Sequence, residues 1–162
     1  MRRLLMLLVA GFALMACSKE GAVFYTAHYP VTRLEVEVTL SAANAEAEEA
    51  IRQIVLQEAP VQVGGGYQLD FNRFDGGILY VRGAANSQAI VGDFTKSPAA
   101  KEMLFVYGEE QYTVQTSRYI DPEQATELTL LTVDVTEHYR TALQDESILK
   151  VHRLEYTAYP AY

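Results

Sequence analysis

The chain has 162 residues, and its 21 acidic side chains exceed its 13 basic ones, which gives a formal net charge of −8. This length suits a single domain with a sizeable core. The basic residues form no cluster, so the composition argues against nucleic-acid binding and against electrostatic docking on anionic lipid. Only one cysteine occurs, so no intramolecular disulfide can form and the core alone must stabilise the fold.

The first sixteen residues have the pattern of an export signal. Arg2 and Arg3 form a short basic start, and residues 4–16 are thirteen apolar residues in a row. A membrane-spanning helix needs roughly 20 such residues, whereas the apolar core of a signal peptide has about 7–15. The sequence therefore predicts a signal peptide over residues 1–16 that is removed on maturation.

The end of this apolar run carries a second signal. Its last residues, Leu14-Met15-Ala16-Cys17, resemble the lipobox of bacterial lipoproteins. The resemblance implies that the Cys17 thiol takes a diacylglyceryl group, that the chain is cut before Cys17, and that the new amino group is acylated. One acyl chain binds a bilayer only marginally, whereas two or three hold firmly. The alternative is an ordinary secretory signal that leaves Cys17 as a free thiol, which is unusual in exported proteins.

The residues after the cysteine indicate which membrane holds the anchor. Ser18 stands where enterobacterial lipoproteins kept at the inner membrane have Asp, and this resemblance favours the outer membrane. Lys19-Glu20 resembles the short charged export tags of Bacteroidota surface lipoproteins. We expect a lipid-anchored envelope protein, facing the periplasm or the cell surface, that looks like an uncharacterised Bacteroidota lipoprotein. Residues 17–22 would form its tether and residues 23–162 one domain, for which we identify no specific family.

Two elements are predicted at the start of this domain. Residues 31–40 alternate between apolar and polar side chains, which predicts a strand. Residues 42–58 change to helical spacing, with Ser41 or Asn44 as the cap and Pro60 as the stop. The apolar face of the strand comprises Leu34, Val36, Val38 and Leu40.

Residues 64–83 predict a first hairpin, because Asp75-Gly76-Gly77 is a turn signal between two runs typical of strands. We expect a three-residue loop that pairs Phe71 with Val81, with a glycine supplying a left-handed residue. A two-residue loop that pairs Asn72 with Leu79 would mix polar and apolar side chains on both faces. The predicted apolar face comprises Leu69, Phe71, Leu79 and Val81.

Residues 102–119 predict a second hairpin with its turn centred on Glu109-Glu110, which pairs Tyr107 with Tyr112. Ser97-Pro98 and Asp121-Pro122 each look like a cap followed by a proline at the first helical position, so we expect a short helical turn at both. The predicted apolar face of this hairpin comprises Met103, Phe105, Tyr107, Tyr112 and Val114.

The rest of the chain predicts a strand over residues 128–135, a short helix over residues 136–145 from a Thr136 cap, and a last strand over residues 148–157. Strands joined by tight turns indicate a mostly antiparallel sheet. With the helix over residues 42–58 packed on that sheet, we predict an α+β fold. The alternative is a β-sandwich.

No motif for catalysis or cofactor binding occurs in the sequence. The three histidines lie far apart, and HExxH, CxxC, GxSxG and SxxK patterns are absent. The glycine run over residues 64–66 lacks the Lys-Ser/Thr pair of a phosphate loop. Paired carboxylates such as Glu109 and Glu110 belong to turns and polar helix faces, which are solvated. We therefore predict no catalytic residue, no cofactor and no metal site.

Two functional hypotheses remain. The first is a lipid-anchored binding or assembly module whose partner is an envelope protein or a glycan, contacted through exposed tyrosines in the similar stretches YTAHYP (25–30) and YTAYP (156–160). These tyrosines are Tyr25, Tyr29, Tyr156 and Tyr159. The second is a small envelope hydrolase or metal-dependent enzyme that uses His138 or His152 with Asp134 or Glu137. The enzyme hypothesis requires at least two of these four side chains to converge in a pocket.

Overall fold

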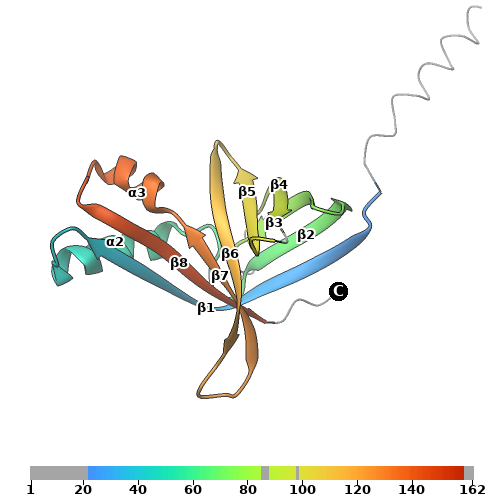
Figure 1. Cartoon of the computed structure of the whole chain (residues 1–162), viewed down its shortest axis with the longest axis horizontal. Helices are drawn as coiled ribbons and strands as arrows, with labels where there is room; N and C mark the ends of the chain where they lie inside the picture. Colours follow the sequence, from blue (N-terminus) through green and yellow to red (C-terminus); the bar gives the residue numbers. More distant parts are fainter. Residues whose placement is uncertain (1–21, 85–87, 98, 159–162) are drawn as a thin grey trace, which may run out of the picture.

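The computed structural model describes residues 22–84, 88–97 and 99–158. The predicted signal peptide and Cys17 lie outside these residues, and so does Tyr159. Eight strands follow one another around a closed antiparallel barrel, each paired with the next, and the last strand pairs with the first (Figure 1). The strands are β1 (Tyr25–Leu40), β2 (Gly66–Arg73), β3 (Gly76–Arg82), β4 (Ala89–Ser97), β5 (Glu102–Tyr107), β6 (Glu110–Ile120), β7 (Glu127–Asp134) and β8 (Ile148–Ala158).

The predicted α+β fold is wrong, and so is the alternative β-sandwich, because the sheet closes on itself. Closure depends on β1, which is 16 residues long. Its first part, Tyr25–Pro30, pairs with β2, and its second part, Val31–Leu40, pairs with β8. A register shift between Val31 and Arg33 separates the two parts. A bulge of this kind bends a strand. The bend lets β1 pair with β2 along its first part and with β8 along its second part, which closes the barrel.

Two helices occur in the described part of the chain, α2 (Ala45–Glu58) and α3 (Thr136–Leu143). The predicted helix over residues 42–58 is α2, which begins three residues later and ends before Pro60. Its cap is Asn44, whose side chain accepts a hydrogen bond of 3.1 Å from the backbone N of Ala47. Ile51 and Val55 are buried in the barrel core, so α2 covers the barrel beside β1 and is not the main element of a layered fold.

Strand β4 was not predicted, because its sequence has no apolar alternation. Phe94 is its one buried side chain. Ser97 ends this strand and caps no helix, and Pro98 lies outside the described residues. The helical turn predicted at Asp121-Pro122 is the turn between β6 and β7. There the Asp121 carboxylate accepts hydrogen bonds from the backbone N atoms of Glu123 and Gln124, at 2.8 and 3.2 Å.

The first predicted hairpin exists, with β2 and β3 as its strands, but in a different register. Leu69 pairs with Leu79, and the turn has two residues, Phe74 and Asp75. Neither Gly76 nor Gly77 has a positive φ. Gly77 instead allows close approach of strands, because an added Cβ would lie 2.0 Å from the backbone O of Asp70.

The second predicted hairpin is β5 and β6, where Tyr107 pairs with Glu110 across Gly108 and Glu109. In both hairpins the register differs from the predicted one by an even number of residues. Because side chains alternate with a period of two, an even error keeps each side chain on its predicted face. The two predicted apolar faces therefore do point into the barrel, and nearly all of their side chains are buried.

The barrel interior is filled by large apolar side chains. An eight-stranded barrel is just wide enough for side chains to fill it, and each fully buried Leu, Val or Phe contributes about 1.5–3 kcal/mol. Apolar side chains of β1, β7 and β8 add to this core. The largest fully buried apolar side chains on the strands are Phe94, Phe105, Leu69, Leu79, Leu131 and Ile148.

Candidate functional site

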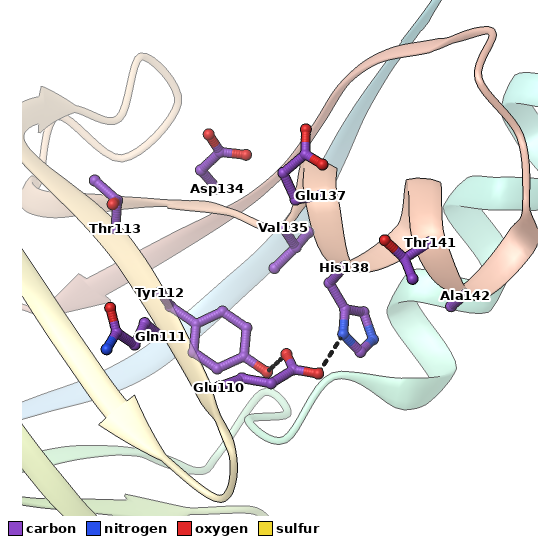
Figure 2. Close-up of a pocket in the computed structure, with 10 residues that line it drawn as sticks. All are labelled: Glu110, Gln111, Tyr112, Thr113, Asp134, Val135, Glu137, His138, Thr141 and Ala142. Carbon is purple, nitrogen blue, oxygen red and sulfur yellow. Dashed lines mark hydrogen bonds and ion pairs between the residues drawn. The ribbon is translucent and has the colours of Figure 1, made fainter.

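A pocket of about 560 Å³ lies between the start of β6, the end of β7 and α3, and we call it the α3 pocket (Figure 2). Its size is in the range of roughly 300–1,000 Å³ that is typical of small-molecule sites. Eight of its ten lining residues are polar in type and two, Val135 and Ala142, are apolar, although most of the exposed lining surface belongs to apolar atoms. The polar lining residues are Glu110, Gln111, Tyr112, Thr113, Asp134, Glu137, His138 and Thr141.

The centre of the α3 pocket is a short hydrogen-bonded chain of three side chains. The hydroxyl of Tyr112 donates to one carboxylate oxygen of Glu110 at 2.6 Å, and Nδ1 of His138 lies 2.7 Å from the other oxygen (Figure 2). Glu110 and Tyr112 share one face of β6 because they are two residues apart. To donate to this carboxylate, Nδ1 of His138 must carry a proton, and in the neutral ring with that tautomer Nε2 is able to accept a hydrogen bond.

Helix α3 brings His138 to this chain and is fixed firmly to β8. Thr136 Oγ1 accepts a hydrogen bond of 3.0 Å from the backbone N of Val151, and Arg140 donates two to the backbone O of Ile148 at 3.1 and 2.9 Å. The carboxylate of Asp134 accepts from the backbone N of Thr136 at 2.9 Å. Thr136 was expected to cap α3, but Val135 stands at the N-cap position without a side-chain cap, and the Thr136 hydroxyl serves this strand contact.

The electrostatics of the chain favour ionised Glu110 and neutral Tyr112. The hydrogen bond from Tyr112 is the largest influence and lowers the pKa of Glu110. Burial opposes it, and the contact with His138 adds to the lowering, so the pKa stays below its ordinary value. Burial, together with the hydrogen bond to Glu110, raises the pKa of Tyr112 well above its ordinary value. Glu110 is therefore a carboxylate at neutral pH, with both of its oxygens engaged by side chains of the pocket.

The residues of the enzyme hypothesis lie partly in this pocket. His138, Asp134 and Glu137 line it, but His138 contacts Glu110 and neither of its two predicted partners. Glu137 contacts Arg140 on the outside of α3. His152 is not among the lining residues, and its Nε2 lies 3.9 Å from an Asp134 carboxylate oxygen.

Glu110 is the pocket residue that sequence reasoning missed. We placed it at a solvated turn tip, whereas it is the first residue of β6 and points to the same side as Tyr112. It lies 28 residues from His138, so no local motif joins the two. The signal in the sequence was the spacing Glu110-x-Tyr112, which puts a carboxylate and a phenol on one face of a strand.

Three of the four tyrosines named as contact residues lie in the described part of the chain, and their surroundings differ. Tyr25 is 43% exposed, whereas Tyr29 is half-buried against the core. Tyr156 is 6% exposed, and the Arg33 guanidinium lies 3.8 Å from the centre of its ring. Its hydroxyl also donates to Glu35 at 3.2 Å. The Tyr156 ring is thus covered by neighbouring side chains, which leaves it little surface for a partner.

A buried ionic cluster lies inside the barrel. Arg153 Nε donates to a carboxylate oxygen of Glu155 at 3.1 Å, and the hydroxyl of Tyr67 donates to the other oxygen at 2.5 Å. The Arg153 guanidinium also lies 5.9 Å from the centre of the Tyr112 ring. Tyr112 therefore touches both the α3 pocket and the buried cluster, and it connects the surface site to the barrel interior.

The described residues contain neither a metal-binding group of side chains nor a membrane-spanning helix. No group of three or more His, Cys, Asp or Glu side chains is arranged there to hold a metal ion. No helix in that part of the chain combines the length and apolarity needed to cross a membrane.

Comparison with protein families, with curated proteins and with solved structures finds no match for the chain. Because no match assigns the chain to a known class of protein, we describe the class from its own architecture. It is a closed, eight-stranded up-and-down barrel with a filled interior and a polar pocket at one end.

Proposed function

We propose that the chain is a lipid-anchored protein of the bacterial cell envelope, held at the outer membrane as its Ser18 suggests, and that its barrel acts as a binding module. The anchor rests on the lipobox at Cys17. The binding role rests on the α3 pocket, in which Glu110, Tyr112 and His138 converge in a hollow of about 560 Å³. This convergence on a rigid scaffold is the observation that carries the proposal.

The lining of the α3 pocket fits a polar ligand. His138 Nε2 accepts a hydrogen bond, and the hydroxyls of Thr113 and Thr141 both donate and accept. Glycans and extended peptides display alternating donors and acceptors of this kind. We therefore favour a segment of an envelope glycan or of a partner protein as the occupant, with no nucleic acid involved.

The binding role is tested by site-specific photo-cross-linking in intact envelopes. A photoreactive phenylalanine analogue at Gln111, an exposed lining residue, is compared with the same analogue at Val91, which is exposed on β4 outside the pocket. We expect an adduct at Gln111 that is absent at Val91 and is lost when His138→Ala is added. Equal adducts at both positions, or none at Gln111, would contradict a site in the α3 pocket.

The anchor is tested separately by labelling cells with an alkyne fatty acid. The wild-type chain should take the label and fractionate with membranes, whereas Cys17→Ala should do neither. A wild-type chain that carries no label would refute the lipid anchor.

A second candidate function is hydrolysis, which one contact favours. Glu110 holds Nδ1 of His138 at 2.7 Å, so the imidazole is oriented by a carboxylate with Nε2 free to take a proton from water. Among the described residues, no serine or cysteine lines the pocket, so water would be the nucleophile. Turnover of ester, amide or glycoside substrates that is abolished by His138→Ala would favour this function over simple binding.

A further inference from the structure

A group of exposed apolar side chains lies where β1 begins and where β2 turns into β3. We call Val23, Phe24, Tyr25 and Phe74 the aromatic patch. Phe24 is 65% exposed and Phe74 is 96% exposed, and their rings are stacked with centres 6.1 Å apart. Contiguous exposed apolar groups of this kind mark surfaces that meet a protein or a membrane.

The aromatic patch is built on regular structure. The backbone N of Phe24 donates to the backbone O of Phe71 at 2.7 Å, which extends the pairing of β1 with β2. The ring of Tyr25 stacks on Phe71 with centres 4.1 Å apart, and Phe71 packs edge-on against the buried Phe94. Phe74 is one of only two residues in its turn, so its position is set by the flanking strands.

The position of the patch in the chain identifies what covers it. Val23 follows Cys17 by six residues, and six residues span at most about 20 Å when fully extended. If Cys17 carries acyl chains, the patch is therefore confined to the neighbourhood of the bilayer surface. Phe74 also lies between Arg73 and Asp75, whose side chains form an ion pair of 3.6 Å, so the turn presents no net charge that anionic lipid would repel.

We propose that the aromatic patch inserts into the interfacial region of the membrane that carries the lipid anchor. The proposal rests on the proposed anchor at Cys17. Phenylalanine rings at this depth leave water while the polar turn backbone stays at the headgroups. Helices α2 and α3 lie at the other end of the molecule from the start of β1 (Figure 1). Docking through the patch therefore turns the α3 end away from the bilayer, where soluble or cell-wall partners reach it.

The test uses the fact that the chain contains no tryptophan. Phe74→Trp places the only tryptophan of the chain in the patch. The acylated full chain is then reconstituted in phosphatidylcholine vesicles that contain lipids brominated on their acyl chains. Bromine quenches indole on contact. The matched control is Leu149→Trp, since Leu149 is 57% exposed on β8 next to α3. Phe24→Trp is a second reporter for the patch.

We expect the emission of Phe74→Trp and Phe24→Trp to shift to the blue and to be quenched, while that of Leu149→Trp stays solvent-like and unquenched. Equal emission at the two ends of the molecule, whether quenched or not, would overturn the membrane contact. Mass measurement of the same samples separates the two proposals. An acylated Cys17 with an unquenched patch overturns the inference alone, whereas an unmodified Cys17 overturns the anchor and the inference together.

Discussion

Arg153 and Glu155 form an ion pair inside the barrel, with Arg153 Nε 3.1 Å from a carboxylate oxygen of Glu155. Both side chains are almost completely buried, and Val36 on β1 and Val133 on β7 are the strand neighbours of Arg153. Burial is the largest influence on the pKa of Arg153 and lowers it, but Glu155, Tyr67 and Tyr107 together outweigh burial, so this pKa is raised. Burial raises the pKa of Glu155, which Arg153 offsets in part. The barrel interior therefore depends on the two charges being kept together.

Removing one partner of this pair should be more harmful than removing both. Glu155→Leu leaves the Arg153 cation buried without a counter-charge, so we expect a loss of about 3–5 kcal/mol in the free energy of unfolding. Replacing both residues, as in Arg153→Met with Glu155→Leu, should recover much of that loss because no charge remains buried. Urea unfolding of the wild type, both single variants and the double variant measures the difference. Additive losses in the double variant would show that the two side chains are not energetically coupled.

The cap of α2 provides a smaller, local test. Asn44 accepts a hydrogen bond from the backbone N of Ala47, so Asn44→Ala should lower the free energy of unfolding by about 1 kcal/mol. Ser41 is the matched control, because it also fits a cap by sequence but lies directly after β1, four residues before the first residue of α2. Ser41→Ala should change stability by less than about 0.5 kcal/mol. Similar losses for the two variants would contradict the assignment of Asn44 as the cap.

Two glycines, Gly77 in β3 and Gly108 in the β5–β6 turn, should lose stability to different extents on substitution. At Gly77 an added Cβ would meet the backbone O of Asp70 at 2.0 Å, and backbone atoms cannot move aside cheaply, so Gly77→Ala should cost about 1–3 kcal/mol. At Gly108 nothing lies within 4 Å, but φ is +65°. Gly108→Asn should cost less than about 1 kcal/mol, since Asn tolerates the left-handed region. Thermal unfolding of both variants checks the order, and a more damaging change at Gly108 would contradict it.

Helices and strands could be predicted from the sequence wherever apolar side chains recur with a regular period on one face of the element. The alternation over residues 31–40 and the helical stripe of α2 each mark one buried face, so the second part of β1 and α2 were found from sequence, whereas residues 25–30 of β1 were not. Strand β4 has one buried side chain, Phe94, and therefore gave no periodic signal. Barrel closure was not predictable, because it depends on the bend at Val31–Arg33 and on pairing between β1 and β8, more than 100 residues apart.

The candidate site shows the same division between local and long-range information. The sequence suggested His138 or His152 with Asp134 or Glu137, because the last two strands could bring these side chains together. All of them except His152 line the α3 pocket. Glu110 reaches the pocket only because β6 pairs with β7, which leads into α3. Its contact with His138 is therefore a consequence of the barrel topology, which the sequence pattern did not reveal.

The hydrogen bonds of Glu110 predict a specific pH dependence. Tyr112 is the largest influence that lowers the pKa of Glu110 below its usual value of 4.5, so Tyr112→Phe should raise this pKa toward 4.5. A carboxyl group whose pKa is lower in the folded state than in the unfolded state stabilises the fold above pH 4.5. That stabilisation is lost as the pH falls through the folded-state pKa. Carbon-13 NMR titration of the Glu110 carboxyl in the wild type and in Tyr112→Phe measures the shift directly.

The same linkage should appear in stability, and Glu110→Gln isolates it. Gln cannot ionise, so the variant should lack the part of the acid-induced loss of stability that protonation of Glu110 causes. Between pH 7 and pH 3 the free energy of unfolding should therefore fall less steeply in Glu110→Gln than in the wild type. Glu109→Gln is the control, because Glu109 is the neighbouring residue in the β5–β6 turn and does not line the α3 pocket. If Glu109→Gln flattens the pH profile as much as Glu110→Gln does, the effect is a general one of turn charge, and the hydrogen-bonded chain of the α3 pocket does not control it.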